Sequence, residues 1–324
     1  MPRAMPETAT NWQVGLIGYG EVGRILAEDL HARSVRATAY DLKLDSPAGE
    51  EMRAHAAAHG TRLAASHAGA VDRADLVVSA VTASQTVQVA EVCAQAVAPG
   101  TFFLDFNSAS PGAKIRAAGL VDAAGGRYVE GAVMTSVPPH RIRVPLLLGG
   151  PDAHALEAPL RTLGFAPRVA SERLGVASAT KMCRSVVVKG LEAMLIESLT
   201  TARRHGVEDD VLASLRETFP GVDWERQASY FFARVIEHGR RRAEEMREAA
   251  QTVREAGLLP WSAEGTAERQ AWLADLADAG VFDGDAAAVG IVDWRVEADR
   301  ILTALSPTRH AATHDIHASH GSDR

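Results

Sequence analysis

Cysteine, lysine and long apolar runs are scarce in this chain of 324 residues. Its two cysteines cannot build a disulfide framework, which indicates a reduced, cytoplasmic setting. No apolar run approaches the ~18 residues of a membrane span, and residues 1–12 lack the apolar core of a signal peptide. The net charge is −7, and there is no long basic run. This balance argues against nucleic acid or an anionic membrane surface as the main partner.

Lysine supplies only four of the 34 basic residues, and arginine supplies the rest. A lysine is therefore more informative in this chain than in an average one. Lys181 and Lys189 lie on one predicted helix, while Lys43 and Lys114 lie elsewhere in the sequence.

Apolar residues make up 47 % and charged residues 23 % of the chain, which is typical of a globular protein large enough for two domains. Up to about residue 170, short apolar runs alternate with helix-period segments. Such alternation is typical of parallel strands joined by right-handed crossovers, as in a doubly wound α/β sheet. The expected strands are 13–18, 35–40, 62–64, 76–80, 102–106, 128–132, 145–149 and 167–170.

Beyond residue 171 helical periodicity replaces the strand pattern, and the expected helices are 177–204, 209–218, 224–256, 263–279 and 286–305. We therefore expect a Rossmann domain over residues 13–172, followed by an all-α domain over residues 173–306. Residues 1–12 are expected to form a flexible arm, and residues 307–324 a disordered tail. The tail carries four histidines, but their spacing fits no compact ligand set, so no metal is expected.

The segment 15–23 reads as a short apolar strand, a G-x-G-x-x-G turn and the start of a helix. In such a turn Gly18 permits the tight bend, Gly20 leaves room for a pyrophosphate, and Gly23 lets the helix pack close to its strand. Free N–H groups at the helix start would meet the anion. The cofactor contacts expected here are Gly18, Tyr19, Gly20, Glu21 and Val22. The alternative is an ordinary glycine turn in a non-binding α/β fold.

The second predicted strand ends at Asp41, about where a ribose 2′-hydroxyl needs a carboxylate acceptor. A 2′-phosphate would meet a negative charge there, which favours NAD over NADP as the cofactor. Lys43 lies two residues further on and keeps NADP possible.

Three segments of small polar residues follow predicted strands and should reach the carboxyl edge of the sheet, where such folds bind their ligand. They contain Val81 and Thr82, then Asn107, then Thr135 and Ser136. Their side chains and backbone N–H groups could orient a nicotinamide and a small substrate. In the second segment Ser110 precedes Pro111, and for this serine a helix N-cap is the favoured interpretation.

The helix expected over 177–204 carries Lys181 and Ser185 on one face. Lys181 follows an uncharged stretch, which suggests partial burial. A desolvated ammonium has a lowered pKa and can exchange protons near neutral pH, as a general acid/base beside a nicotinamide must. A surface lysine that snorkels from an amphipathic helix fits the same spacing.

The chain resembles the β-hydroxyacid dehydrogenase superfamily, which contains 6-phosphogluconate, 3-hydroxyisobutyrate and tartronate-semialdehyde enzymes and to which the imine reductases are related. The matching motifs are G-Y-G-E-V-G at 18–23, D-F-N-S-A-S-P at 105–111, E-G-A-V-M-T-S at 130–136, L-L-G-G at 147–150 and the helix with Lys181. The run 238–246 is similar to a branch with a shorter α-helical C-terminal domain.

The resemblance implies that Lys181 is the catalytic lysine, which takes a hydroxyl proton in oxidation and donates it in reduction. It also implies that Thr135, Ser136 and Ser185 hold substrate, although Ser185 stands where the family has asparagine. Decarboxylating members carry a glutamate seven residues after the lysine. Here that position is Val188, which argues against phosphogluconate chemistry, although Glu192 lies one helical turn further on and could replace that glutamate. Imine reductases usually carry Asp or Tyr at the lysine position, so an intact lysine favours a carbonyl/alcohol couple.

In this superfamily the C-terminal domain often completes the active site of a neighbouring subunit, so a homodimer is expected. His238, Arg241 and Arg242 share one face of the helix expected over 224–256 and could clamp a carboxylate or phosphate. A solvated face balanced by nearby glutamates is the alternative. Arg184, which lies on the helix of the catalytic lysine, is a further candidate substrate contact.

We therefore expect an NAD(P)-dependent dehydrogenase that transfers a hydride between the nicotinamide and a small hydroxyacid or its semialdehyde or ketone. One alternative is an imine reductase, which Arg184 and the altered loop at Met134 would permit. The other is a dinucleotide-binding sensor without turnover.

Overall fold

The computed structural model describes residues 9–283 and 292–306. The chain forms two compact units, one of residues 1–194 and 238–273 and the other of residues 195–237 and 274–324. The expected tail, 307–324, lies outside the described residues, as do residues 1–8 of the expected arm. The last residue of that arm, Trp12, is buried and stacks on Phe102 with ring centroids 5.8 Å apart.

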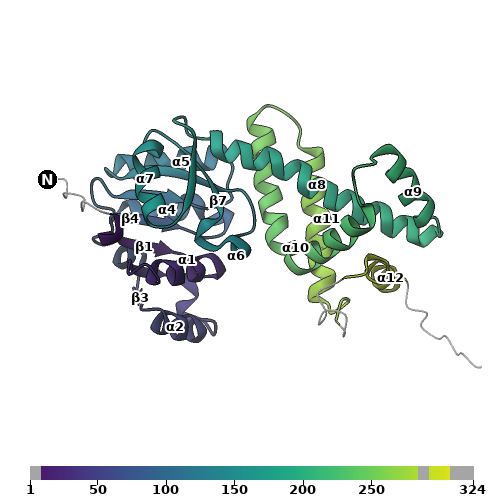
Figure 1. The fold of residues 1–324 in the computed structure, drawn as a ribbon, viewed down its shortest axis with the longest axis horizontal. Helices are drawn as coiled ribbons and strands as arrows, with labels where there is room; N and C mark the ends of the chain where they lie inside the picture. The colour runs from purple at the N-terminus through teal and green to yellow at the C-terminus, as the bar shows by residue number, and fades with distance from the viewer. Residues whose placement is uncertain (1–8, 284–291, 307–324) are drawn as a thin grey trace, which may run out of the picture. The chain divides into compact units, whose positions relative to one another are not determined.

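A β-sheet is the basis of the first unit (Figure 1). It has eight strands in the order β3-β2-β1-β4-β5-β6-β7-β8. Every expected strand forms, which confirms the doubly wound α/β fold. The order reverses direction beside β1, and the carboxyl ends on either side of this switch point form the usual ligand site of such sheets. The strands are β1 Gln13–Ile17, β2 Arg36–Tyr40, β3 Arg62–Leu63, β4 Leu76–Ser79, β5 Phe102–Asp105, β6 Arg127–Val133, β7 Pro145–Gly149 and β8 Ala166–Ser171.

One strand departs from the parallel pattern that the alternation predicts. β7 runs antiparallel to β6, whereas β8 is again parallel to β7. The link between β6 and β7 holds only α6 Val137–His140 and a 3-10 turn, Arg141–Arg143. A parallel crossover needs about a dozen residues or more, usually with a full helix, so this short link turns the chain back instead.

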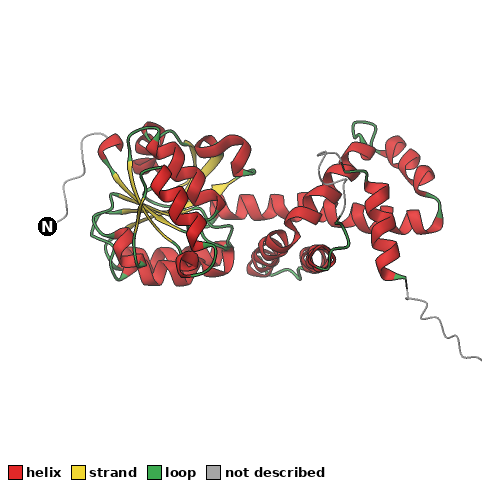
Figure 2. Ribbon diagram, turned by 90° about the horizontal axis from the view of Figure 1, so that it is seen from below, coloured by secondary structure: helices red, strands yellow, loops and turns green. Residues whose placement is uncertain are grey.

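Helices cover both faces of the sheet, as Figure 2 shows. β4 and β5 are buried along their whole length, as parallel strands covered on both sides must be. Alternate residues face opposite layers: Leu76 and Val78 pack in one apolar cluster and Val77 in the other. The covering helices are α1 Glu21–His31, α2 Gly49–Ala58, α3 His67–Val71, α4 Thr86–Ala94, α5 Pro111–Ala123 and α7 Ala153–Thr162.

The rest of the described chain is helical, which confirms the expected change after residue 171. In the first unit, Met182, Met246 and Ala263 pack in one apolar cluster and join three of these helices. In the second unit, Trp294 donates from its indole N–H to Glu225 at 2.8 Å. No described helix has the length and apolar character needed to cross a membrane. The helices are α8 Val176–His205, α9 Glu208–Thr218, α10 Trp224–Glu255, α11 Trp261–Asp278 and α12 Trp294–Leu305.

Candidate functional site

The turn between β1 and α1 has the conformation that its three glycines predict. Gly18 has a φ of +94°, and a Cβ there would overlap the carbonyl oxygen of Ala80. A Cβ on Gly23 would overlap the carbonyl oxygen of Gly18, so only glycine lets α1 begin this close to the turn. A Cβ on Gly20 would meet no protein atom within 4 Å. The space beside Gly20 is therefore open to a phosphate, and the loop fits a dinucleotide.

The carboxylate of Asp41 is fixed beside this turn, at the end of β2. Its Oδ2 accepts a hydrogen bond from the backbone N–H of Tyr19 at 2.7 Å, and its Oδ1 accepts from Lys43 N–H at 2.8 Å. Each carboxylate oxygen has a further lone pair, so both could still accept from a ribose hydroxyl. The Tyr19 side chain is fully buried, and the Lys43 side chain is exposed.

Asn107 joins the carboxyl ends of two neighbouring strands. Its side-chain carbonyl accepts from Val81 N–H at 2.8 Å, and its amide donates to Ser79 Oγ at 3.0 Å. The structure thus brings together Val81 and Asn107, two of the expected cofactor contacts, while Thr82 is exposed. Ser110 caps α5, as expected, by accepting from the backbone N–H of Ala113.

A buried charge network supports the loop that contains Asn107. Lys114 Nζ lies 2.9 Å from Asp105 Oδ1 and also donates to the Asp105 carbonyl oxygen at 2.9 Å. The hydroxyl of Tyr128 donates to Asp105 Oδ2 at 2.7 Å, and Asn107 N–H donates to Oδ1 at 2.8 Å. Lys114 and Asp105 are each only 1 % exposed. Both carboxylate oxygens of Asp105 therefore have hydrogen-bond partners, and these contacts fix the start of the loop after β5.

Lys181 reaches this loop from α8. Its ammonium donates to Ser108 Oγ at 2.6 Å, and its side chain is partly buried. The pKa of Lys181 is lowered to about 8, chiefly by burial; the carboxylate of Glu245 opposes the shift, and the positive charge of Lys189 adds to it. The amine can therefore give up and regain a proton near neutral pH.

The position of Lys181 depends on how α8 begins. The carboxylate of Glu130 on β6 accepts from Gly175 N–H at 2.5 Å and from Ser178 N–H at 2.7 Å, and the Glu130 residue is fully buried. These N–H groups belong to the first turn of the helix, where a negative charge is favourable. Glu130 therefore anchors the helix that carries Lys181.

Carboxylates of α10 hold both α8 and the start of α5. Glu245 forms an ion pair with Lys189 of α8. Burial raises the pKa of Glu245, but the positive charges of Lys189 and Lys181 outweigh this effect and lower the pKa to about 2. Glu248 accepts from Ser110 N–H at 2.7 Å. Helix α10 is thus linked to the lysine helix on one side and to the loop after β5 on the other.

A second buried ion pair joins the same two helices. Arg242 donates twice to the carboxylate of Glu192, and both side chains are almost fully buried. The amide of Gln270 lies 3.4 Å from Glu192 Oε2. Arg242 is therefore a packing residue rather than part of a solvated face.

The expected substrate residues lie in different surroundings. Arg241 is half-exposed, and its guanidinium lies 3.4 Å from the carboxylate of Glu21, on the first residue of α1. Ser185 is buried one turn after Lys181. Ser136 occupies the N-cap position of α6 without a side-chain capping hydrogen bond, and Thr135, Arg184 and His238 range from exposed to half-buried. The hydrogen bond of Lys181 goes to Ser108, a residue of the second polar segment that the substrate prediction did not include.

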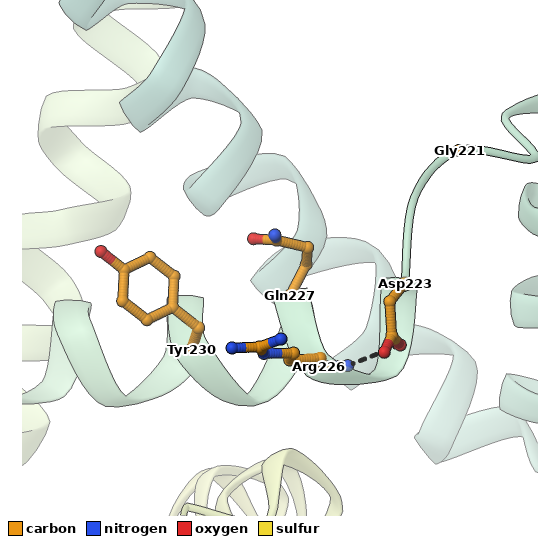
Figure 3. A pocket seen from close by; sticks show the side chains of 5 residues that line it. All are labelled: Gly221, Asp223, Arg226, Gln227 and Tyr230. Atoms are coloured by element: carbon orange, nitrogen blue, oxygen red, sulfur yellow. Dashed lines mark hydrogen bonds between the residues drawn. The ribbon is translucent and has the colours of Figure 1, made fainter.

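A separate hollow of about 530 Å³ lies in the second unit, at the start of α10. Figure 3 shows its lining, with Arg226 N–H donating to Asp223 at 3.1 Å. Tyr230 on its wall is half-exposed. The lining includes none of the residues that the sequence predicts for cofactor or substrate. Its residues are Gly221, Asp223, Arg226, Gln227 and Tyr230.

Sequence reasoning missed several residues that build this site. Lys114 could have been found, because three of the four lysines of the chain lie in this region and rarity was the available signal. Glu245 and Glu248 had no such signal. Glutamate is common on helix surfaces, and their partners are 56 and 138 residues away in sequence.

Two family models match the chain: the NAD-binding domain of 6-phosphogluconate dehydrogenase over residues 13–155, and a domain of unknown function, DUF1932, over residues 202–273. A solved structure of a conserved hypothetical protein from Sinorhizobium meliloti is 38 % identical, with a TM-score of 0.70 over 89 % of this chain and 96 % of that one. A conserved protein described as structurally similar to 3-hydroxyacid dehydrogenases is 29 % identical, with a TM-score of 0.63 over 82 % and 99 %. A 3-hydroxyisobutyrate dehydrogenase from Mycobacterium tuberculosis shares the fold, with a TM-score of 0.64 and 17 % identity over 90 % and 99 %.

Proposed function

We infer that this chain, which belongs to the 3-hydroxyisobutyrate dehydrogenase-like branch of the β-hydroxyacid dehydrogenase superfamily, interconverts a small hydroxyacid and its semialdehyde or ketone. The observation that carries the proposal is the hydrogen bond from Lys181 to Ser108 at the carboxyl edge of the sheet. It supports the proposal because an amine whose pKa is lowered to about 8 lies against the loop after β5.

The cofactor, when bound, would supply or accept the hydride. In reduction, Lys181 Nζ would donate a proton to the oxygen of the carbonyl whose carbon gains the hydride. In oxidation the same nitrogen would take the hydroxyl proton. Ser108 Oγ accepts from the ammonium and fixes its direction, and Glu130 fixes the helix behind it. Asp41 favours NAD, because it would accept from ribose hydroxyls and repel a 2′-phosphate.

The substrate would lie between Lys181, Ser185 and the loop of Thr135 and Ser136. Met134 of this loop packs on a cluster that includes Ala177, one turn before the lysine, so the loop and the lysine share one neighbourhood. A cationic group such as Arg241, Arg184 or His238 would attract the substrate's carboxylate. An anionic hydroxy compound is therefore the favoured substrate class.

Lys181→Met tests the role of the amine. We expect the rate of hydride transfer to fall by about two to four orders of magnitude, while NADH binding, measured by fluorescence, remains. Cys183→Ser, an exposed change two residues along α8, is the matched control and should leave both unchanged. In the wild type the reduction rate should fall as pH rises through about 8, and the oxidation rate should rise, because the two directions need opposite protonation states.

An unchanged rate in Lys181→Met would remove the lysine from the mechanism. NADH binding without lysine-dependent turnover of any substrate would favour the sensor. A panel of ketoacids, semialdehydes and cyclic imines separates the dehydrogenase from the imine reductase, because each enzyme should reduce only its own class.

We also propose that the chain works as a homodimer. Val187, Leu191 and Met194 are exposed apolar residues at helical spacing on α8, and such a stripe is typical of a surface that another subunit covers. Light scattering at a series of protein concentrations would give the mass in solution.

A further inference from the structure

Two histidines of α2 and a glutamate of α1 form a cluster that the proposed reaction does not use. His55 and His59 are four residues apart, so their side chains lie on the same side of the helix. Their candidate ligand atoms and one carboxylate oxygen of Glu28 all lie within 4.8 Å of one another. The two imidazole rings have centroids 4.5 Å apart.

The end of α2 fixes the place of the second histidine. His59 is the C-cap residue, and its N–H donates to the His55 carbonyl oxygen at 3.1 Å. Gly60 follows with a φ of +60°, and Thr61 N–H donates back to Ala56 at 2.9 Å. This glycine turn closes the helix directly after His59 and leaves its ring beside that of His55.

Neighbouring groups orient the other two side chains. Tyr19 Oη lies 3.0 Å from His55 Nδ1, and Arg141 donates to Glu28 Oε2 at 2.6 Å. The remaining atoms, His55 Nε2 and Glu28 Oε1, face each other at 2.9 Å. In metal sites the second ring nitrogen of a ligating histidine is commonly held by such an outer partner.

The charges around the cluster favour a cation. Arg141 faces two carboxylates, those of Glu28 and Asp29, at 2.6 and 2.9 Å. One positive charge therefore meets two negative charges.

We propose that Glu28 Oε1, His55 Nε2 and a ring nitrogen of His59 bind a divalent transition-metal ion, with Zn²⁺ as the natural candidate. Imidazole and carboxylate are ligands that such ions prefer. Ligand atoms around tetrahedral zinc lie about 3.4 Å apart. On binding the ion, His55 Nε2 and Glu28 Oε1 would therefore move apart from their 2.9 Å separation, and the half-buried His59 ring would turn toward them.

Another histidine of α1 lies beside the end of α2. His31 lies three residues after Glu28, on the same face of the helix. A Cβ on Gly60 would lie 2.9 Å from the His31 ring, so this ring packs against the residue that follows His59. His31 or a water would complete the coordination.

The bound ion would connect α1 to α2 behind the glycine turn. With the metal on Nε2, the Nδ1–H of His55 donates to Tyr19 Oη. The backbone N–H of Tyr19 in turn donates to Asp41. The ion would therefore hold the tyrosine of the glycine turn in place, as a structural rather than a catalytic metal.

The test is calorimetric titration of Zn²⁺ into the full-length protein, purified without a histidine tag. The chain carries His310, His314, His317 and His320 near its C-terminus, so the titration is repeated with all four changed to glutamine. Co²⁺ gives a second reading, because its visible absorption reports the number and geometry of its ligands. We expect one site per chain in both backgrounds and a higher melting temperature with Zn²⁺.

His59→Ala and His59→Gln should each weaken Zn²⁺ binding at least about tenfold, because losing even an outer partner of a ligand costs about that much. His154→Ala is the matched control, because this exposed histidine lies 3.8 Å from Glu172 and outside the cluster. It should leave the affinity unchanged. Circular dichroism and the melting temperature without metal show that each variant is folded. The proposal would be overturned if the site were lost in the four-glutamine background, or if both folded His59 variants bound Zn²⁺ as tightly as the unchanged protein. The cluster would then be only a chain of hydrogen bonds.

Discussion

The sheet edge and the pair of helices α8 and α10 hold their functional groups by different means. At the edge, the glycine turn positions backbone N–H groups, and Asp41 accepts from the N–H groups of Tyr19 in this turn and of Lys43 after β2. In the helix pair, charged side chains hold each other: Arg242 with Glu192, and Lys189 with Glu245. The first arrangement depends on conformation and empty space, the second on matched buried charges.

This difference determines how each region fails when a residue changes. A side chain added at the edge blocks a ligand without harming the fold, as long as the protein itself leaves room. A charge removed from the helix pair leaves its partner buried and unpaired, which costs stability before it affects chemistry.

The largest effect is expected in the helix pair. Arg242→Met should lower the free energy of unfolding by about 3–5 kcal/mol, because Glu192 then stays buried without its partner. Arg247→Met is the control on the same helix, since its pair with Glu268 is exposed at 3.8 Å and contributes at most about 1 kcal/mol. Urea denaturation measures both.

The double variant Arg242→Met/Glu192→Leu should recover much of that loss, because it removes both charges together. Equal losses in the single and the double variant would show that packing volume, rather than charge, is the cause.

The next effect tests the sheet edge. Gly20→Ala should weaken NADH binding about a hundredfold, ~2.7 kcal/mol, because the added methyl enters the space of the pyrophosphate. Stability should stay unchanged or rise slightly. Gly119→Ala on α5 is the control, since a Cβ there also meets no atom within 4 Å and no ligand is expected nearby. Tight NADH binding in Gly20→Ala would place the pyrophosphate elsewhere.

The same contrast explains what could be predicted from the sequence. The strands, the glycine turn and the Ser110 cap depend on local spacing, so they could be predicted and are confirmed. The antiparallel direction of β7 could be predicted only from the short link between β6 and β7. The roles predicted for Lys181 and for the polar residues after β5 remain predictions, although Lys181 does lie against the loop after β5.

The partners of the helix pair could not be predicted in this way. Glu245 meets Lys189 across 56 positions, and Arg242 meets Glu192 across 50. Nothing local distinguishes these residues from solvated charges on an amphipathic helix. The cluster of Glu28, His55 and His59 could not be predicted for the same reason. The spacing of the two histidines is visible in the sequence, but the carboxylate comes from another helix.

The smallest expected effect is on the free energy of unfolding and comes from Lys181, which lies on α8 and contacts the loop at the sheet edge. Its pKa is lowered from 10.5 to about 8, chiefly by burial, so the folded state disfavours the charged form. This cost is fully present below about pH 8 and disappears as pH rises toward the ordinary pKa of about 10.4. Lys181→Met should therefore raise the free energy of unfolding by about 1 kcal/mol near pH 7. The gain should shrink steadily between about pH 8 and 10. Denaturation of both proteins at these pH values measures the difference. A gain that does not change with pH would mean that methionine packs better, and that the lysine is not held in a strained, catalytically useful state.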